Sequence, residues 1–284
     1  MARDEEAFDA EEFSEKKKSS SSLKLKLETI IPIIVIIGVI LLIVFKTNVL
    51  SGGIPLFEGK GAAVLVIGSP SPEFTRVLND AENKDIIRSL RHVTVDSIQH
   101  NPSETLKNYD IVILDQSLSA DKSITRTVGE AIKNYVQSGG KFIVVLNSGI
   151  ERPGDSSVIG WTATFGDIIP VKCDPTLYSV PSCKNTLRMN GIIYSVRSDS
   201  KSAGYKIMYG IERVPALEAA GLLQTETYDV TATGTEIAYF QDARSGKTVT
   251  AIVEKPLLLG KVIYFNYNPG LSEAIFVNTI KYLK

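Results

Sequence analysis

A serine at the end of an apolar run is the first residue in this chain that could do chemistry. The segment SGGKFIVVLNSGIERPG, residues 138–154, passes from a glycine pair through a strand-like run to Ser148. In α/β enzymes, a nucleophile is often mounted where such a strand ends in a tight turn. A G-x-S-x-G elbow needs glycines two residues before and after the serine, and those positions hold Leu146 and Ile150. The sequence therefore predicts an ordinary strand-end turn at Ser148.

A base that could activate a nucleophile is also missing from the expected place. The chain has 2 histidines, His92 and His100, and both precede Ser148, Cys173 and Cys183. A triad in another chain order stays open, because triads are defined by geometry. The sequence contains no P-loop and no G-x-G-x-x-G fingerprint, and the cysteines and histidines do not form a zinc pattern. We therefore expect no catalytic residue, no metal and no cofactor.

Polar residues follow the predicted strands, and they form the remaining candidate site. In an open parallel sheet, ligands bind beyond the carboxyl ends of the strands. Hydroxyl and amide groups there suit a hydroxyl-rich ligand such as a glycan, although the same residue types also build ordinary loops. The candidate ligand contacts are Ser69, Asp115, Gln116, Asn147 and Ser148, with Ser97, Asn266 and Asn268 as further strand-end positions.

Two cysteines flank a short loop with the sequence CDPTLYSVPSC. A disulfide between Cys173 and Cys183 fits this spacing, provided that the domain faces an oxidising compartment. Two unrelated buried thiols are the alternative.

The elements that must position these residues alternate between strands and helices. Continuous apolar runs at 62–68, 110–115 and 141–147 are typical of strands buried on both faces, and amphipathic stretches separate them. We also expect a helix where Ile86, Ile87 and Leu90 are spaced, strands at 92–98 and 204–212, a hairpin over 235–255 and a closing helix over 271–284. The predicted fold class is α/β, a three-layer α/β/α domain with a mostly parallel sheet and an antiparallel C-terminal hairpin extension.

Several of these segments resemble the class I glutamine amidotransferase-like, flavodoxin-like superfamily. The resemblance covers residues 61–284 and lies in YDIVILDQS, YVQSGGKFIVVLN, GW…FGDIIPV and GKVIYFNYNP. It is stronger to the non-catalytic relatives, such as trehalose-utilisation-like proteins and membrane-anchored prokaryotic domains. Catalytic members carry a Cys or Ser on a strained, glycine-flanked elbow and a later histidine, so the resemblance implies the fold without the chemistry.

A charge-free segment near the N-terminus predicts one membrane span. TIIPIIVIIGVILLIVF, residues 29–45, would rise about 25 Å as a helix. Flanking lysines extend it to a signal anchor over 23–46, because their stems can snorkel. A cleaved signal peptide is the alternative, but the preceding segment is long and acidic.

The lysines before the span predict a cytoplasmic N-terminus and a C-terminal domain outside the cell membrane. Residues 1–22 form a disordered cytoplasmic tail and 47–60 a linker in this interpretation. The near balance of 31 basic and 32 acidic residues excludes a nucleic-acid partner of the usual basic kind. We therefore expect a non-catalytic accessory or scaffold subunit of a membrane or cell-envelope complex, from a prokaryote and, by composition, an archaeon. A glycan-binding receptor domain and an atypical hydrolase are the alternatives.

Overall fold

The computed structural model describes residues 35–39, 61–174, 181–196, 199–214 and 221–284. The chain divides into two units, Met1–Phe57 and Glu58–Lys284. In the first unit only residues 35–39 are described, and they are helical. Within the described ranges, no helix has the length and apolar character needed to cross a bilayer. The predicted tail, linker and most of the anchor lie outside these ranges, so the anchor stays a prediction.

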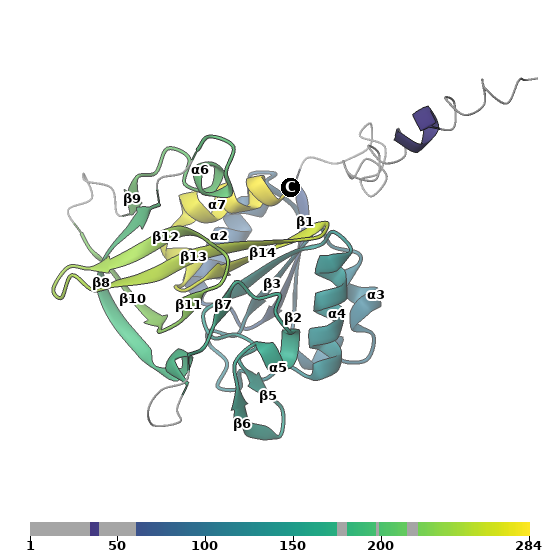
Figure 1. The fold of residues 1–284 in the computed structure, drawn as a ribbon, viewed down its shortest axis with the longest axis horizontal. Helices are drawn as coiled ribbons and strands as arrows, with labels where there is room; N and C mark the ends of the chain where they lie inside the picture. Colours follow the sequence, from purple (N-terminus) through teal and green to yellow (C-terminus); the bar gives the residue numbers. More distant parts are fainter. Residues whose placement is uncertain (1–34, 40–60, 175–180, 197–198, 215–220) are drawn as a thin grey trace, which may run out of the picture. The chain divides into compact units, whose positions relative to one another are not determined.

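The second unit is built around a ten-stranded mixed sheet (Figure 1). Five neighbouring strands are parallel and form one half of the sheet, with β2 (Ile87–Val93) at its edge. In spatial order they are β2, β1 (Ala62–Gly68), β3 (Ile111–Asp115), β4 (Lys141–Val145) and β14 (Gly260–Phe265). The prediction of a largely parallel central sheet in an α/β fold is confirmed.

Continuous apolar sequence explains why the inner strands of this half are buried on both faces. Alternate side chains of β1 enter different cores: Val64 and Val66 pack on one face of the sheet, Leu65 and Ile67 on the other. Both faces are dry, so a strand in this position needs an apolar residue at every step.

The rest of the sheet is antiparallel, and it is larger than the expected hairpin. The hairpin is present as β12 (Thr235–Asp242) and β13 (Thr248–Leu257), with β13 pairing β14. Three further strands extend it: β8 (Thr186–Ser195), β10 (Leu223–Tyr228) and the short β9 (Arg213–Val214). Two small ribbons pair β5 (Glu151–Arg152) with β6 (Asp155–Ile159), and β7 (Val171–Lys172) with β11 (Thr231–Ala232).

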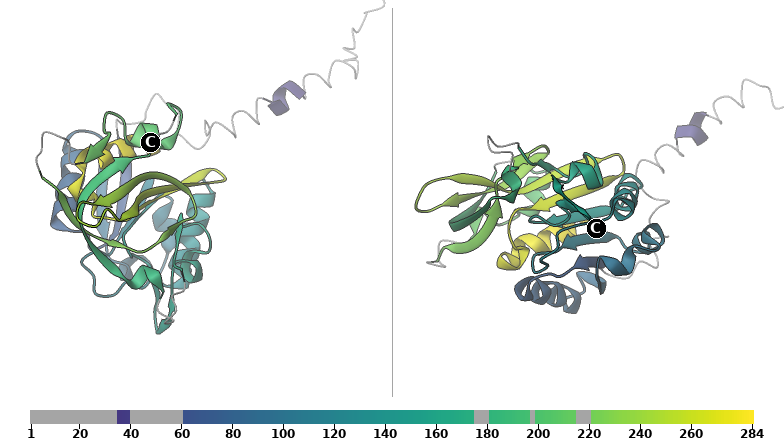
Figure 2. Two further views of the ribbon diagram at one scale, coloured as in Figure 1. Left: turned by 60° about the vertical axis from the view of Figure 1, so that its left-hand side comes forward. Right: turned by 90° about the horizontal axis from the view of Figure 1, so that it is seen from below.

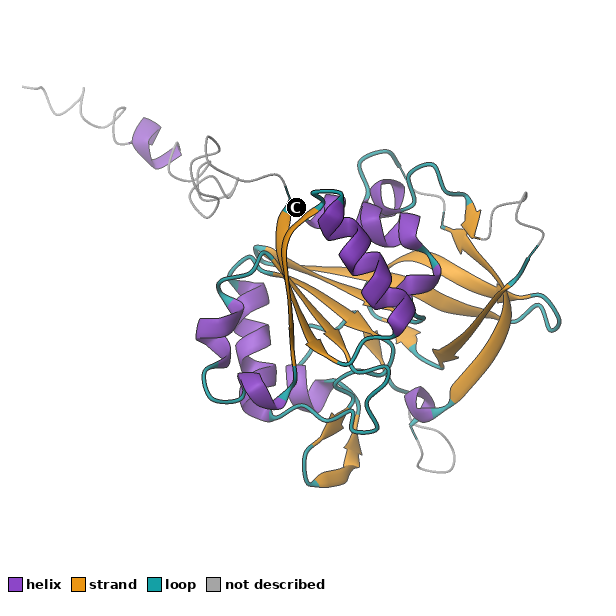
Figure 3. Ribbon diagram, turned by 180° about the vertical axis from the view of Figure 1, so that it is seen from behind, coloured by secondary structure: helices purple, strands orange, loops and turns teal. Residues whose placement is uncertain are grey.

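Helices cover both faces of the sheet, as Figure 2 and Figure 3 show. One layer contains α2 (Pro72–Asn83), α6 (Ala203–Ile207) and α7 (Glu273–Leu283). The other contains α3 (Pro102–Leu106), α4 (Arg126–Gln137) and α5 (Thr162–Phe165). The apolar stripe of α7, with Ile275, Phe276, Thr279 and Ile280, is buried as its spacing predicts.

Two element predictions were wrong. The residues Ile86, Ile87 and Leu90 do not continue a helix, because Asp85 takes a left-handed φ of 58° and ends α2 just before the edge strand β2. The strand expected at 92–98 is therefore β2 in shifted bounds. The segment expected as a strand at 204–212 begins instead with α6, capped by the Ser202 hydroxyl.

Candidate functional site

A cavity of about 640 Å³ opens at the carboxyl end of the parallel strands. One side of it comes from the loops after β1, β3, β4 and β14, and the other from β8, β10 and the β12–β13 turn. This is the position at which open α/β sheets bind ligands. The antiparallel extension gives the edge of the sheet a second wall.

The parallel side of the cavity is fixed by bonds between its loops. Ser71 caps α2, accepting a hydrogen bond from the Phe74 amide at 3.1 Å, and its Oγ also accepts one from Asn268 Nδ2 at 2.8 Å. Asn268 Oδ1 accepts a hydrogen bond from the Gly270 amide at 3.0 Å. The loops after β1 and β14, at opposite ends of the domain sequence, are therefore tied together beside the cavity.

The antiparallel side is organised by Asp242, at the end of β12. Its carboxylate accepts hydrogen bonds from the backbone amides of Ser245, Asn190 and Arg244, at 2.8, 3.1 and 3.0 Å. These bonds, led by that from Ser245, lower the pKa of Asp242 to about 2. The carboxylate thus stays charged and joins β8 to the hairpin turn.

Two asparagines bring amide groups to the cavity from its two sides. Asn147 follows β4, and no hydrogen bond joins its side chain to another described residue. Asn190 lies on β8, and its Oδ1 is buried without a hydrogen-bond partner among the described residues. Buried polar atoms are normally paired, so Asn190 Oδ1 leaves that amide with unused hydrogen-bonding capacity at the cavity wall, and the half-buried Asn147 amide is free to bond to water or to a ligand.

The remaining lining mixes charge with apolar surface. Arg188 and Glu226 face each other across β8 and β10 and form an exposed ion pair at 3.4 Å. Other polar groups come from Glu73, Ser117, Gln224, Thr225, Tyr228 and Arg244. Apolar groups come from Leu118, Leu146, Met189 and Leu271.

Ser148 does not line this cavity. Its side chain is fully buried, and its Oγ accepts a hydrogen bond from the backbone N–H of Gln116 at 2.8 Å. Its carbonyl accepts one from Trp161 Nε1 at 2.8 Å. The Ser148 hydroxyl, which the sequence offered as a candidate nucleophile, therefore links the end of β4 to the end of β3.

Gln116 completes the same buried network. Its Oε1 accepts a hydrogen bond from the Gly149 amide at 2.8 Å, and its Nε2 donates to the carbonyls of Asp121 and Ser123. These contacts all lie within the protein, and only 2% of the residue is exposed. Gln116 therefore shapes the loop after β3 and does not reach the cavity.

The strained backbone position after β4 is Leu146, two residues before Ser148. Leu146 has a φ of 53°, a conformation that costs a residue with a Cβ about 1–2 kcal/mol. Such strain concentrates at functional turns. Here it carries an aliphatic side chain that is 8% exposed and lines the cavity. The turn after β4 therefore has the backbone strain of a nucleophile elbow, but a leucine occupies the strained position.

Asp115, the last residue of β3, is fully buried and does not belong to the cavity lining. Its Oδ1 accepts hydrogen bonds from the amide and hydroxyl of Ser117, while Oδ2 has no partner among the described residues. Burial raises the pKa of Asp115 to about 6, although the bonds from Ser117 and the charge of Lys122 oppose the shift. The carboxyl does not line the cavity, so contact with a ligand there is not part of this geometry.

The other strand-end candidates divide. Asn268 lines the cavity, whereas Ser69 and Ser97 are exposed elsewhere. Asn266 is fully buried, bonding through its amide to the backbone of Tyr228 and Thr250. Of the five main candidates, only Asn147 reaches the cavity.

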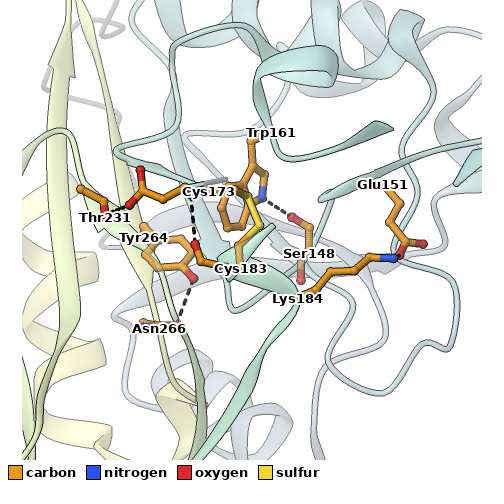
Figure 4. The surroundings of a disulfide bond; sticks show 11 residues. Ser148, Glu151, Trp161, Cys173, Cys183, Lys184, Thr231, Tyr264 and Asn266 are labelled. Carbon is orange, nitrogen blue, oxygen red and sulfur yellow. Dashed lines mark hydrogen bonds and ion pairs between the residues drawn. A yellow bond between two sulfur atoms is a disulfide. The ribbon is translucent and has the colours of Figure 1, made fainter. Parts of the chain in front are cut away.

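The predicted disulfide between Cys173 and Cys183 is present, with a Cα–Cα distance of 5.0 Å (Figure 4). It lies near Trp161, whose ring meets that of Tyr264 edge-on at 5.6 Å. Cys183 is fully buried and closely precedes β8. The bridge therefore holds the segment that leads into one wall of the cavity.

Among the described residues, no three His, Cys, Asp or Glu side chains form a group that could hold a metal ion. The lining offers no cluster of carboxylates or imidazoles for a cofactor metal. Its amides, hydroxyls and paired charges are groups that hydrogen-bond to a polar organic ligand.

Comparison with known proteins supports the fold. No protein-family model matches the sequence, and no curated protein matches it either. Among solved structures, a ThuA-like protein from Bacteroides uniformis is 12% identical with a TM-score of 0.51, covering 81% of this chain and 95% of its own. This similarity shows the fold and is consistent with the class I glutamine amidotransferase-like architecture.

Two β-galactosidases are also similar, from Rahnella sp. R3 and Bacillus circulans sp. alkalophilus. They are 14% and 16% identical, each with a TM-score of 0.49. Each match covers 78% of this chain but spans only 30% of the length of the β-galactosidase.

The sequence did not reveal the second wall of the cavity. Arg188 and Asn190 lie on β8, and nothing in their sequence spacing places them opposite Asn147. Gln224 and Glu226 belong to a strand that the sequence did not predict. Its alternating polar residues were the available signal, and that signal is common to any half-exposed strand.

Proposed function

We propose that this chain is a non-catalytic binding domain whose cavity holds a carbohydrate or a similarly hydroxyl-rich ligand. The observation that carries the proposal is the pair of available amides, Asn147 and Asn190, on the two sides of one cavity. An amide offers both donors and acceptors, which matches neighbouring sugar hydroxyls.

The shape and the remaining lining support this ligand class. The volume of about 640 Å³ lies in the range of small-molecule sites. Tyr228 offers an aromatic ring with a polar tip, and Leu118 and Met189 offer apolar surface for the C–H faces of a sugar.

The strained turn after β4 supports the non-catalytic part of the proposal. Leu146 occupies the position with left-handed backbone, and Ser148 points into a buried network. Asp115, whose raised pKa would suit an acid, is buried outside the cavity lining. Leu146 carries no reactive group, and neither Ser148 nor Asp115 lines the cavity, so none of the three can act on a ligand there as a nucleophile or an acid.

The accessory role in a membrane or envelope complex remains a prediction from the sequence. Ligand binding is compatible with it, because a binding subunit can supply specificity to a larger assembly. Co-purification of the full-length protein from native membranes would test that role separately.

A glycan array probed with the full-length protein in detergent tests the binding proposal. A glycan that binds should lose about tenfold in affinity with Asn147→Ala or Asn190→Ala, since each removes a hydrogen bond. Asn108→Ala is the matched control, because Asn108 is exposed and its amide bonds to the Glu104 carbonyl. Absence of any glycan hit, or equal affinity in all three variants, would overturn the proposal. Hydrolysis of a bound glycan would overturn its non-catalytic part.

A further inference from the structure

The turn between β13 and β14 presents two leucines at the amino end of the parallel strands. Leu258 is 86% exposed and Leu259 50% exposed, and Leu257 pairs Gly260 to close a two-residue turn. Single exposed apolar residues are common on surfaces. Two at the tip of a tight hairpin need a reason, because polar residues and glycine normally form such turns.

The backbone of this turn makes the choice of leucine costlier. Leu258 has a φ of 45°, in the left-handed region that favours glycine or asparagine. Gly246, in the turn at the other end of β13, has a φ of 67° and meets the same requirement without a Cβ. Leucine at position 258 is therefore conformationally unfavourable in this turn, and it also exposes an apolar side chain.

The base of the hairpin holds the tip in a fixed place. The end of β13, from Lys255 on, pairs only with β14, so the arm extends beyond β12. A Cβ on Gly260 would lie 2.0 Å from the Val136 carbonyl and 2.4 Å from that of Gly140. Because the backbone is packed this closely on the end of α4, the two leucines project from a rigid support.

The chain enters the domain at the same edge of the sheet. β1 begins at Ala62, and three parallel pairings connect β1 through β3 and β4 to β14. Three strand spacings separate the start of β1 from that of β14, about 14 Å. The predicted apolar span ends at Phe45, and fifteen residues separate it from Gly61, so this segment can reach at most about 50 Å.

Lysines share this edge with the leucines. Lys141 and Lys261 are register partners at the start of β4 and β14, and Lys284 ends α7, which returns to this side of the sheet. Of these, Lys261 is already engaged within the domain, because its Nζ lies 3.9 Å from Glu254 and donates to the Tyr282 hydroxyl. Asp110, at the same edge, is paired with Arg88 at 3.5 Å. Apolar side chains with neighbouring lysines are the composition of segments that lie in the headgroup region of a bilayer.

We propose that the β13–β14 turn is a membrane-docking tip, with Leu258 and Leu259 inserted at the headgroup boundary of the bilayer in which the chain is anchored. This contact holds the amino edge of the sheet toward the lipid. The cavity at the carboxyl edge then faces away from the membrane.

A site-specific fluorophore in the full-length protein, reconstituted in lipid vesicles, tests this. Both native cysteines are in the disulfide, so a Leu259→Cys variant carries one reactive thiol. A nitroxide quencher carried on the lipid should lower the emission of this label at least about twofold, because interfacial segments sit about 5–10 Å deep. A Ser245→Cys label, on the opposite turn of β13, should be unaffected, and Leu258→Asn should abolish the quenching at position 259.

Three results would overturn the proposal. The first is equal quenching at positions 245 and 259, or none at 259. The second is protection of the 259 label without lipid that grows with protein concentration, which would indicate a second copy as the occupant. The third is failure of the protein to float with the vesicles, which would contradict both the docking proposal and the predicted membrane anchor.

Discussion

The two turns of β13 lie at opposite edges of one sheet and are built from opposite chemistry. The β12–β13 turn, Ala243 to Lys247, is polar, bonded to Asp242 and placed beside the cavity. The β13–β14 turn is Leu258–Leu259, exposed and strained. In a βα repeat, one edge collects the loops that follow strands and the other the loops that precede them. A single strand therefore connects a polar turn beside the cavity to an apolar, exposed turn at the amino edge.

The largest effect on stability is expected for Gln116, whose buried side chain connects the loops at the carboxyl edge of the sheet. Gln116→Leu leaves the Gly149 amide and the Asp121 and Ser123 carbonyls without their partner. We expect the free energy of unfolding to fall by about 3 kcal/mol, because unpaired buried groups lose their hydration without return. Urea denaturation measures this, with Gln99→Leu as control, since Gln99 bonds only to exposed Asp96. Equal stability of both variants would contradict the structural role of Gln116.

Removal of the disulfide should weaken ligand binding in the cavity but leave the contact of the docking tip with lipid unchanged. Cys173→Ala with Cys183→Ala opens a loop of 10 positions, which corresponds to about 2–3 kcal/mol of stability. The bridge leads into β8, so affinity for a cavity ligand should fall as well. Lipid quenching at position 259 should persist at a temperature where the variant is folded. A variant that loses tip contact first would show that the two edges are not independent.

Asp115 should make the stability of the carboxyl edge depend on pH. Its pKa is raised from 3.8 to about 6 in the folded protein, so the native state binds its proton more tightly than the unfolded chain. The Asp115 contribution is therefore most favourable below about pH 4, and it declines as pH rises to about 6, by on the order of 2–3 kcal/mol. Asp115→Asn should remove this component from unfolding curves measured between pH 4 and 7. An unchanged pH profile would show that the carboxyl does not titrate in this range.

The smallest effect is expected at the amino edge. Leu258→Asn replaces a strained leucine by a residue that tolerates left-handed φ, so stability should stay level or rise by up to about 1 kcal/mol. A thermal denaturation scan without lipid measures it, with Leu222→Asn as an exposed leucine for comparison. Marked destabilisation would mean that the turn is needed for folding rather than for docking.

Local sequence was enough to predict the central sheet. The runs AAVLVIG, DIVILD and KFIVVLN are apolar at their inner positions because helices cover both faces of the sheet, and that requirement is visible in the sequence. The β12–β13 hairpin, the closing helix and the Cys173–Cys183 bridge were predicted on equally local grounds. The first part of the edge strand β2 was predicted as a helix because only one residue of β2 is buried, so its apolar spacing resembles that of a helix.

The sequence by itself determined the layers of this protein and the edge at which its polar residues gather. Only the tertiary structure decided which of those residues face the cavity, because the left-handed φ of Leu146 sets the path of the chain that turns Ser148 inward and leaves Asn147 at the lining. It also decided the second wall, since β8 and β10 approach Asn147 through long-range strand pairing. Side-chain direction after a strand depends on one or two backbone angles, and pairing depends on the whole sheet. Neither quantity can be read from residue spacing.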